Sequence, residues 1–241
     1  MRQYTKQIYI GLMCGSSLDA IDAVLVDCQQ NTLDIIDKHS IPLPIDIKNH
    51  ILALAHNWDS SNPEQESLIA QYDQQIAELS VQVISQLLAK TNLKATQIRA
   101  IGSHGVTIAH YPNATPGFSI QLGNGKFIAQ ATKIDTVTNF RQADIDAGGQ
   151  GAPLACSFHN EYFRDAANNL AVLNLGGIAN ITILAKDSAA QIIGYDTGPA
   201  NTLLDAWAQQ YLHTNYDDQG SWARSGQINQ QLLAKLLAHE F

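Results

Sequence analysis

A long stretch of helical periodicity, set among short β-branched runs, limits the folds open to this chain. Between Pro63 and Thr91 the apolar residues recur every three or four positions, as along one face of an amphipathic helix, and Ser61 or Asn62 is placed to cap it. Strand-like runs precede and follow this helix: QIYIGLM, AIDAVLVDC, LDIIDKHSIPL, IRAIGSHG and FSIQLGNG. Strands that alternate with helices predict an α/β fold with a mixed sheet.

The second half of the chain repeats part of this order. Its strand, glycine turn and strand, NLAVLNLGGIANITILA, match QIYIGLMCGSSLDAIDAVLV near the N-terminus. IIGYDTGP likewise matches IRAIGSHG, each a strand that ends in a small polar turn, and a helix follows in ANTLLDAWAQQYL. The pattern predicts a duplicated α/β lobe with a cleft between the copies, although two short matches also arise by chance in α/β proteins.

Composition limits the ligands. With 45% hydrophobic and only 15% charged residues, the chain has enough apolar material for a core and is globular rather than disordered. Its formal net charge of -8 argues against a nucleic-acid or polyanion partner bound through bulk positive charge. An anionic ligand must therefore be held locally, by backbone amides at glycine turns and helix N-termini.

Cysteine usage and the N-terminal segment both favour a cytoplasmic protein. The three cysteines, Cys14, Cys28 and Cys156, are odd in number and widely spaced, which fits neither a disulfide framework nor a zinc cluster. The apolar run after the basic start MRQYTK is too short and too interrupted for a signal peptide, and no stretch is long enough to span a bilayer. We therefore expect no membrane partner.

Two glycine turns are candidate phosphate sites. Residues 15–17, between the first two strands, offer unhindered amides and two hydroxyls, while Asp19 and Asp22 can hold a hydrated Mg²⁺. LGGIAN, residues 175–180, is the matching turn of the second half. Each turn also has the composition of an ordinary hairpin. Together, the two turns could close on one polyphosphate from both sides.

The motif GSHG, residues 102–105, ends a strand, which places Ser103 and His104 where α/β folds usually bind ligands. A lone histidine is also a common structural hydrogen-bonding residue. The Gly-x-Ser-x-Gly elbow of serine hydrolases is missing, because Asp19 stands where the final glycine would be. The Walker A and His-Glu-x-x-His patterns are missing as well.

The segment FRQADIDAGGQGAPL, residues 140–154, joins acidic residues to a glycine-rich loop. The glycines let backbone approach a ligand closely, and Pro153 suits the first turn of the helix expected next. Asp144 can act as a general base if its carboxylate faces the cleft, with Arg141 as a partner for it or for an anionic substrate group. The other reading is a helix-entry loop with a solvated aspartate. The entropic penalty of ordering several glycines weakens that reading.

Six motifs together carry a resemblance to a known family. In chain order they are GLMCGSSLDAID, GSHGVTIAHYP, FSIQLGNG, FRQADIDAGGQGAPL, NLGGIANIT and GYDTGPANTLLDAW. The chain resembles the anhydro-N-acetylmuramic acid kinases, of the sugar kinase, Hsp70 and actin superfamily, over essentially its whole length. The resemblance implies duplicated ribonuclease-H-like α/β lobes with an inter-lobe cleft, at residues 1–135 and 136–241. The second lobe is expected to be incomplete, because family members continue beyond this point.

The resemblance also implies an activity. Family enzymes use ATP, Mg²⁺ and water to open the internal bridge of 1,6-anhydro-N-acetylmuramic acid and to phosphorylate O6, which gives N-acetylmuramic acid 6-phosphate for peptidoglycan recycling. Asp144 aligns with the family's catalytic base, which activates the water. A homodimer is a further expectation from the family.

The remaining site residues also come from the family motifs. The first phosphate-binding segment comprises Gly15, Ser16, Ser17, Leu18, Asp19, Ala20, Ile21 and Asp22, and its two aspartates are the expected metal ligands. The second comprises Gly176, Gly177 and Asn180. The residues expected to face the sugar or the cleft floor are Ser103, His104, Gln121, Arg141, Asp196 and Asn201.

Departures from the family pattern are few. Ser16, Ala20, Val106 and Ala200 stand where the family usually has Thr, Gly, Gln and Gly. Val106 thereby removes a polar group from the expected sugar site. Two other readings stay open: a catalytically inactive remnant that still binds sugar or nucleotide, and a kinase of the same superfamily that acts on another sugar or a small carboxylic acid.

Overall fold

The computed structural model describes residues 7–15, 17–29, 32–59, 61–187 and 189–239. The chain forms two compact units, Met1–Leu154 and Ala155–Phe241. The predicted boundary between residues 135 and 136 falls inside the first unit, because the strand that begins at Thr136 pairs with the sheet of that unit. None of the helices in the described ranges is both long and apolar enough to cross a bilayer.

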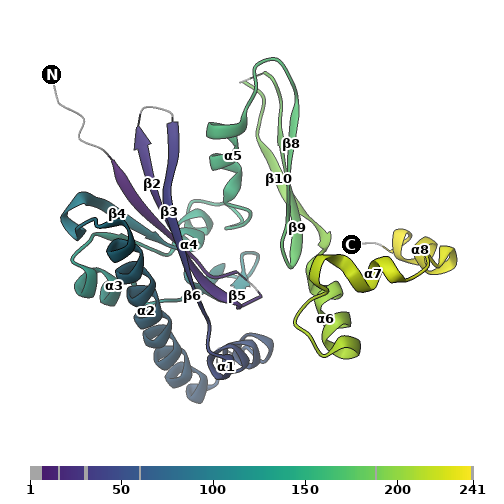
Figure 1. Cartoon of the computed structure of the whole chain (residues 1–241), viewed down its shortest axis with the longest axis horizontal. Helices are drawn as coiled ribbons and strands as arrows, with labels where there is room; N and C mark the ends of the chain where they lie inside the picture. Colours follow the sequence, from purple (N-terminus) through teal and green to yellow (C-terminus); the bar gives the residue numbers. More distant parts are fainter. Residues whose placement is uncertain (1–6, 16, 30–31, 60, 188, 240–241) are drawn as a thin grey trace. The chain divides into compact units, whose positions relative to one another are not determined.

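The first unit is built on a five-stranded mixed sheet of order β3-β2-β1-β4-β7 (Figure 1). Its strands are β1 (Ile8–Met13), β2 (Ala20–Gln29), β3 (Thr32–Pro42), β4 (Ile98–Ser103) and β7 (Thr136–Val137). β2 runs antiparallel to both β1 and β3, whereas β4 is parallel to both β1 and β7. The predicted mixed α/β sheet is therefore confirmed.

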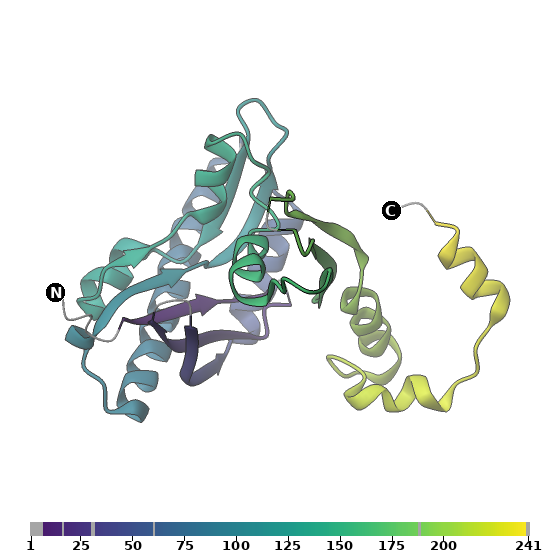
Figure 2. The ribbon, with the colours of Figure 1, turned by 90° about the horizontal axis from the view of Figure 1, so that it is seen from above.

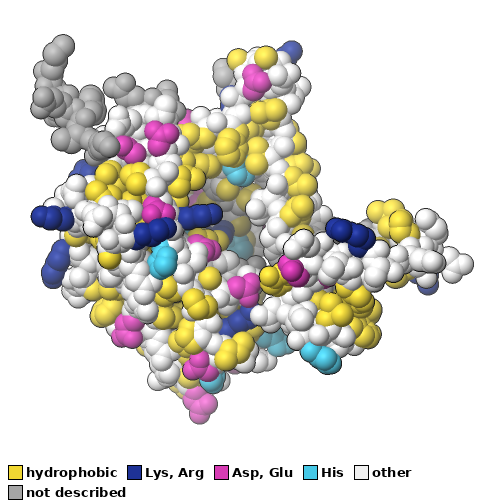
Figure 3. Space-filling view, viewed as in Figure 1, with side chains coloured by type: hydrophobic (Ala, Val, Ile, Leu, Met, Phe, Trp, Pro, Cys, Tyr) yellow, Lys and Arg dark blue, Asp and Glu magenta, His cyan; other side chains and the backbone are white. Residues whose placement is uncertain are grey.

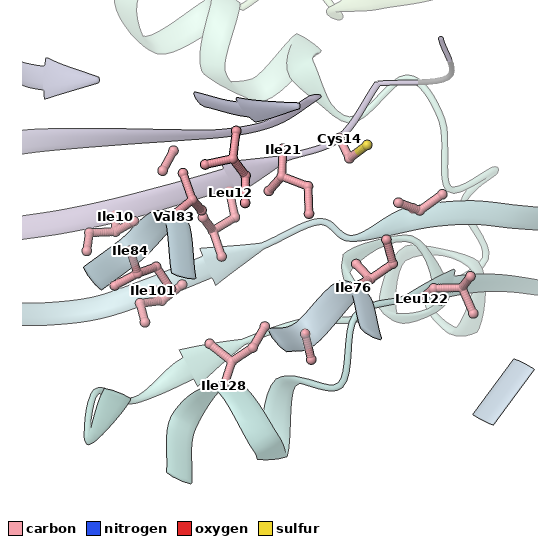
Figure 4. Close-up of a cluster of buried hydrophobic side chains, with 14 of the residues drawn as sticks. Ile10, Leu12, Cys14, Ile21, Ile76, Val83, Ile84, Ile101, Leu122 and Ile128 are labelled. Carbon is pink, nitrogen blue, oxygen red and sulfur yellow. The ribbon is translucent and has the colours of Figure 1, made fainter. Parts of the chain in front are cut away.

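One face of this sheet is buried under a long helix. Along β1 and β2 buried residues alternate with more exposed ones, as expected for a sheet covered on one side. The covering helix is α2 (Pro63–Thr91), with the bounds that the periodicity predicts, and the side chain of its N-cap Asn62 accepts a hydrogen bond from the Glu64 amide. Figure 4 shows apolar side chains of α2 and of the strands meeting in one cluster, among them Ile10, Ile84 and Ile101.

The rest of the first unit consists of helices and one hairpin outside the five-stranded sheet. These elements are α1 (Ile45–His56), η1 (Ala95–Gln97), β5 (Val106–Tyr111), β6 (Phe118–Leu122), α3 (Gly125–Thr132) and α4 (Phe140–Asp146). β5 and β6 form a separate antiparallel hairpin. The sequence patterns predict β6 and a short helix at GKFIAQATK, which is α3, but miss α1, β5, β7 and α4. α4 has only seven residues, too few to show a helical period, and a glycine-rich loop follows it.

The second unit has a smaller, antiparallel sheet of order β10-β9-β8. Its elements are α5 (Ala155–Phe163), β8 (Leu170–Leu175), β9 (Ile178–Leu184), β10 (Ile193–Pro199), α6 (Asn201–Leu212), η2 (Asp218–Gly220), α7 (Ser221–Ser225) and α8 (Gln230–Leu237). The predicted strand pair, third strand and two helices are confirmed. Pro153, expected in the first turn of α5, precedes that helix by two residues.

The strand order corrects one detail of the predicted repeat. β10 follows β9 along the chain and pairs with it antiparallel, as β3 does with β2 in the first unit. β4, by contrast, lies parallel to β1. β10 therefore corresponds to β3, and the match of IIGYDTGP with IRAIGSHG was misleading, because both are strands that end in a polar turn.

Apolar burial differs greatly between the units. Within the described residues of the second unit, the buried apolar side chains are Ala179, Leu184 and Ala208. Large apolar side chains instead lie exposed along its strands and on α6 and α8, where they form yellow areas in Figure 3. They include Leu173, Leu175, Leu203, Leu204, Trp207, Leu232 and Leu236. The hydrophobic core of the molecule thus belongs to the first unit, whose layers are also seen from above in Figure 2.

Candidate functional site

The loop that follows α4 wraps the carboxylate of Asp144. Asp144 lies in the last turn of α4, and its Oδ2 accepts a hydrogen bond from the Gly151 amide at 2.7 Å. The Gly149 amide donates to the Asp144 carbonyl oxygen at 2.8 Å. A Cβ atom at Gly149 would collide with the carboxylate, so any other residue there would force the carboxylate or the loop to move. The glycines of AGGQGAP are therefore explained in part by how closely the loop approaches Asp144.

Arg141 and His104 hold the far end of this loop. The Arg141 Nη1 donates to the Gly151 carbonyl oxygen at 2.7 Å, and its Nε donates to His104 Nε2 at 2.9 Å. Burial lowers the pKa of His104 below its usual range, and the Arg141 charge lowers it further, although the Gly105 backbone acts in the opposite direction. Arg141, expected beside Asp144 or a substrate anion, thus reaches Asp144 through the loop.

A polar cavity of about 240 Å³ opens in the first unit beside His104. Its lining combines three residues of the expected sugar site, Ser103, His104 and Gln121, with the start of α3 and the segment before α4. Gln121 Nε2 donates to Ser119 Oγ at 2.7 Å, while within the described residues its buried Oε1 accepts no hydrogen bond. Gln121 therefore borders the cavity, while its Oε1 is buried away from it.

Four polar residues of the cavity wall escape sequence reasoning: Asp73, Asn124, Thr138 and Asn139. Asp73 belongs to the middle of α2 and accepts a hydrogen bond from the Gly123 amide at 2.8 Å, which holds the turn between β6 and α3. The only available signal was Asn124, which precedes a helical pattern as an N-cap residue does and bonds to the Phe127 amide. The others come together only through the fold.

Val106, in contrast, does not line this cavity. Its side chain is buried in the hydrophobic core, opposite Leu122 on the neighbouring strand. The departure from the family pattern at this position therefore places an apolar side chain in the hydrophobic core.

The first predicted phosphate segment is the turn between β1 and β2. Ser16 lies outside the described residues. Leu18 has a φ of 53° and its amide donates to the Gly15 carbonyl oxygen at 3.0 Å, which makes the turn tight. The side chains of Leu18 and Ile21 point into the core, so those two residues can offer a ligand only their backbone. Space around the Gly15 Cα is open, as a close-approaching anion requires.

Of the two predicted metal ligands, Asp19 lies in this turn and Asp22 lies three residues later, in β2. Asp19 forms an ion pair with Lys48 at 2.7 Å, and Asp22 accepts a hydrogen bond from the Ser40 hydroxyl. Among the described residues, no group of three or more His, Cys, Asp or Glu side chains is arranged around a metal position. Mg²⁺ keeps several waters and needs only one or two carboxylates, so the pair suits that ion.

The same two carboxylates affect the pKa of the Cys14 thiol. Burial, with smaller contributions from the charges of Asp22 and Asp19, raises the pKa of its thiol from the ordinary 9.0 to about 11, against the opposing charge of Lys48. The folded chain therefore holds this proton at a pH where the unfolded chain has lost it. We expect the free energy of unfolding to fall by roughly 2–3 kcal/mol as the pH rises from about 9 to about 11.

Other groups titrate in the same range, so the measurement is a comparison. Urea unfolding of the wild type and of Cys14→Ala at a series of pH values gives the stability difference between the two chains. That difference should shrink as the pH rises. A constant difference would contradict the raised thiol pKa.

The second predicted phosphate segment forms the hairpin turn of the second unit. The Gly176 and Gly177 carbonyl oxygens accept hydrogen bonds from Asn201 and Ala200 amides at 3.0 and 2.9 Å, which ties the start of α6 to the turn. Asn180 lies directly opposite Asp196 on the neighbouring strand, so their side chains share a face. The structure thus brings together all five predicted residues of this unit.

Comparisons with known proteins match this chain along nearly all of its length. A family model described as anhydro-N-acetylmuramic acid kinase matches residues 7–241. The anhydro-N-acetylmuramic acid kinase of Coxiella burnetii is 44% identical over 98% of this chain and 62% of its own. That of Shewanella loihica is 41% identical over 98% of this chain and 63% of its own.

The chain therefore spans less than two thirds of the length of these relatives. Among solved structures, a reductive activator for corrinoid, iron-sulfur protein is 14% identical over 81% of this chain and 32% of its own. Its TM-score is 0.43, which is too low to establish a shared fold.

Proposed function

Since the chain belongs to the anhydro-N-acetylmuramic acid kinase family, we propose that it opens 1,6-anhydro-N-acetylmuramic acid with water and phosphorylates O6 from ATP. The product is N-acetylmuramic acid 6-phosphate, as peptidoglycan recycling in the cytoplasm requires. The observation that carries the proposal is the loop-wrapped carboxylate of Asp144, joined by hydrogen bonds through Arg141 to a polar cavity. Asp144 does not itself line the cavity, and the link from its carboxylate to the lining residue His104 runs through Gly151 and Arg141.

Asp144 is the general base of this proposal. The Gly151 amide fixes its Oδ2, so the direction of the carboxylate is set by the loop. The other oxygen takes a proton from water as the water oxygen attacks the anomeric carbon. The bond between that carbon and the bridging O6 breaks, and the freed O6 takes the γ-phosphoryl group of ATP. Positioned proton transfer of this kind contributes about 10²–10⁴-fold to a rate.

The cavity is the proposed sugar site. Its volume of about 240 Å³ is near the lower end of ligand pockets, which run from about 300 to 1,000 Å³, and this suits a single sugar ring better than a longer chain. Sugar hydroxyls and the acetamido group need hydrogen-bond partners, which Ser103, Asp73 and Asn124 offer from three different elements.

The glycine turns at Gly15 and at Gly176 are the proposed phosphate-binding segments, through their backbone amides. Asp19 and Asp22 would hold a hydrated Mg²⁺, which neutralises phosphate charge when it is bound. Phosphoryl transfer depends mainly on position and charge, so amide-rich turns supply what it needs. Assembly as a homodimer, a property implied by the family resemblance, completes the proposal.

The decisive experiment follows oxygen from water into the product. The purified 241-residue chain is mixed with Mg-ATP and 1,6-anhydro-N-acetylmuramic acid in ¹⁸O-labelled water, and the product is read promptly by mass spectrometry. We expect N-acetylmuramic acid 6-phosphate that carries the label at the anomeric hydroxyl. No labelled product from a folded chain would overturn the proposal for this chain. Reactions without ATP, or in ordinary water, are the controls.

A further inference from the structure

Three hydrogen bonds connect His104, in the wall of the cavity, to the carboxylate of Asp144, and a fourth holds the His104 ring. The Gly105 carbonyl oxygen lies 2.9 Å from His104 Nδ1, Arg141 Nε donates to His104 Nε2 (2.9 Å), and Arg141 Nη1 donates to the Gly151 carbonyl oxygen (2.7 Å). The last runs from the Gly151 amide to Asp144 Oδ2 (2.7 Å). We call this series the His104–Arg141 hydrogen-bond series. His104 is the member that lines the cavity.

The donors and acceptors of the hydrogen-bond series define one protonation state of His104. A guanidinium nitrogen can only donate, so His104 Nε2 must be the acceptor. The ring proton then lies on Nδ1 and donates to the Gly105 carbonyl oxygen. An imidazolium has no free acceptor, and the lowered pKa of His104 favours the neutral ring. His104 in this state cannot donate a proton from Nε2 to a substrate.

Arg141 donates two hydrogen bonds whose directions fit its planar guanidinium group. Nε and Nη1 point in fixed directions from the same group, one toward the end of β4 and the other toward the glycine loop. A lysine at this position has one nitrogen and cannot satisfy both acceptors with the same geometry. Arg141 therefore fixes the distance between His104 and the loop.

Gly151 connects Arg141 to the carboxylate of Asp144. It is buried, has a φ of 70°, and a Cβ there would lie 3.1 Å from atoms of Arg141, His110 and Ile145. Its carbonyl is held by Arg141 and its amide by Asp144, so the two bonds belong to the peptide groups on either side of one tightly packed Cα. Movement of one peptide group would move the other.

We propose that His104 and Arg141 are positioning residues, which set the direction of the Asp144 carboxylate through Gly151 and connect it to the wall of the sugar cavity. The inference rests on the proposed function for its catalytic consequence and assigns Arg141 to the loop instead of to a substrate anion. A misplacement of about 1 Å at a reacting group can lower a rate about 10²-fold. This positioning role explains why His104 and Arg141, which are 37 residues apart in the sequence, are joined by a hydrogen bond.

The first test uses hydrogen exchange and needs no turnover. NMR with ¹⁵N-glycine labelling follows the Gly151 amide in the full chain, in Arg141→Lys and in Arg164→Lys. Arg164 is the matched control, since its Nε bonds to Asn160 Oδ1 and its Nη1 to the Asp187 carbonyl, far along the sequence from Asp144. We expect exchange at Gly151 to be at least about 10-fold faster in Arg141→Lys and unchanged in Arg164→Lys. Equal exchange in all three chains would overturn the inference.

Two histidine variants separate positioning from simple loss of fold. His104→Gln keeps an acceptor for the Arg141 Nε, whereas His104→Leu removes it. The leucine variant should show the fast Gly151 exchange, and the glutamine variant should restore most of the protection. Equal protection in both variants would contradict the role of His104.

Kinetics of sugar turnover then separate positioning from substrate binding. Arg141→Lys should lower kcat by about 10- to 100-fold and leave KM for the sugar within about threefold. An increase of KM with an unchanged kcat would place Arg141 on the substrate and overturn the inference. If the wild-type chain gives no product, the proposed function fails while the exchange experiment still decides the positioning role.

Discussion

Asp144→Asn should lower turnover of 1,6-anhydro-N-acetylmuramic acid by about 10²–10⁴-fold, while Asp146→Asn leaves it unchanged. The amide of asparagine still offers an oxygen to the Gly151 N–H, so the loop should keep its position. It cannot take a proton from the attacking water. The loss therefore falls on the chemical step and leaves sugar binding within a few-fold of the wild type.

Asp146 is a close control for this substitution. It lies in the same helical turn, and its carboxylate accepts a hydrogen bond from Gln142 Nε2 at 2.7 Å on an exposed surface. Turnover of the sugar is measured by product formation, and sugar affinity by calorimetry. Turnover in Asp144→Asn equal to that of the wild type would remove Asp144 from the role of base. Equal losses in both variants would point to damage of α4 instead.

The fold could be predicted from sequence where the periodicity is long. The pattern from Pro63 to Thr91 spans many turns, so the bounds of α2 follow from residue spacing, and the structure identifies Asn62, one of the two candidate caps, as the N-cap. α1 and α4 could not be predicted in this way. α1 follows two prolines and has no side-chain N-cap, and α4 is shorter than the window over which a helical period becomes visible.

The site could be predicted only in part, because its geometry depends on contacts between distant segments. The motif around Ser103 and His104 marks the end of β4, but nothing in the sequence states that His104 accepts from Arg141. Asp73 reaches the cavity from the middle of a helix whose pattern predicts only a core face. Such residues are identified by what the fold places beside them.

Gly149→Ala should destabilise the chain by about 1–3 kcal/mol and lower turnover together with it. The substitution adds one methyl group where the Asp144 carboxylate already lies, so either the carboxylate or the loop must move. The Gly149 amide also bonds to the Asp144 carbonyl, which limits how far the loop can shift. The expected movement turns the carboxylate away from the direction set by the Gly151 amide.

A double-mutant cycle identifies the carboxylate as the cause. In an Asp144→Ala background the oxygen atoms are gone, so Gly149→Ala should be nearly neutral there, and the two substitutions should couple by about 0.5–3 kcal/mol in the free energy of unfolding. Gly226→Ala is the matched control, because its Cβ would meet only the Ala223 carbonyl, at 3.4 Å, and its φ is -83°. The same cost for Gly149→Ala in both backgrounds would show that the glycine is needed for backbone conformation, whereas a cost that disappears with the carboxylate shows that the loop is shaped around the base.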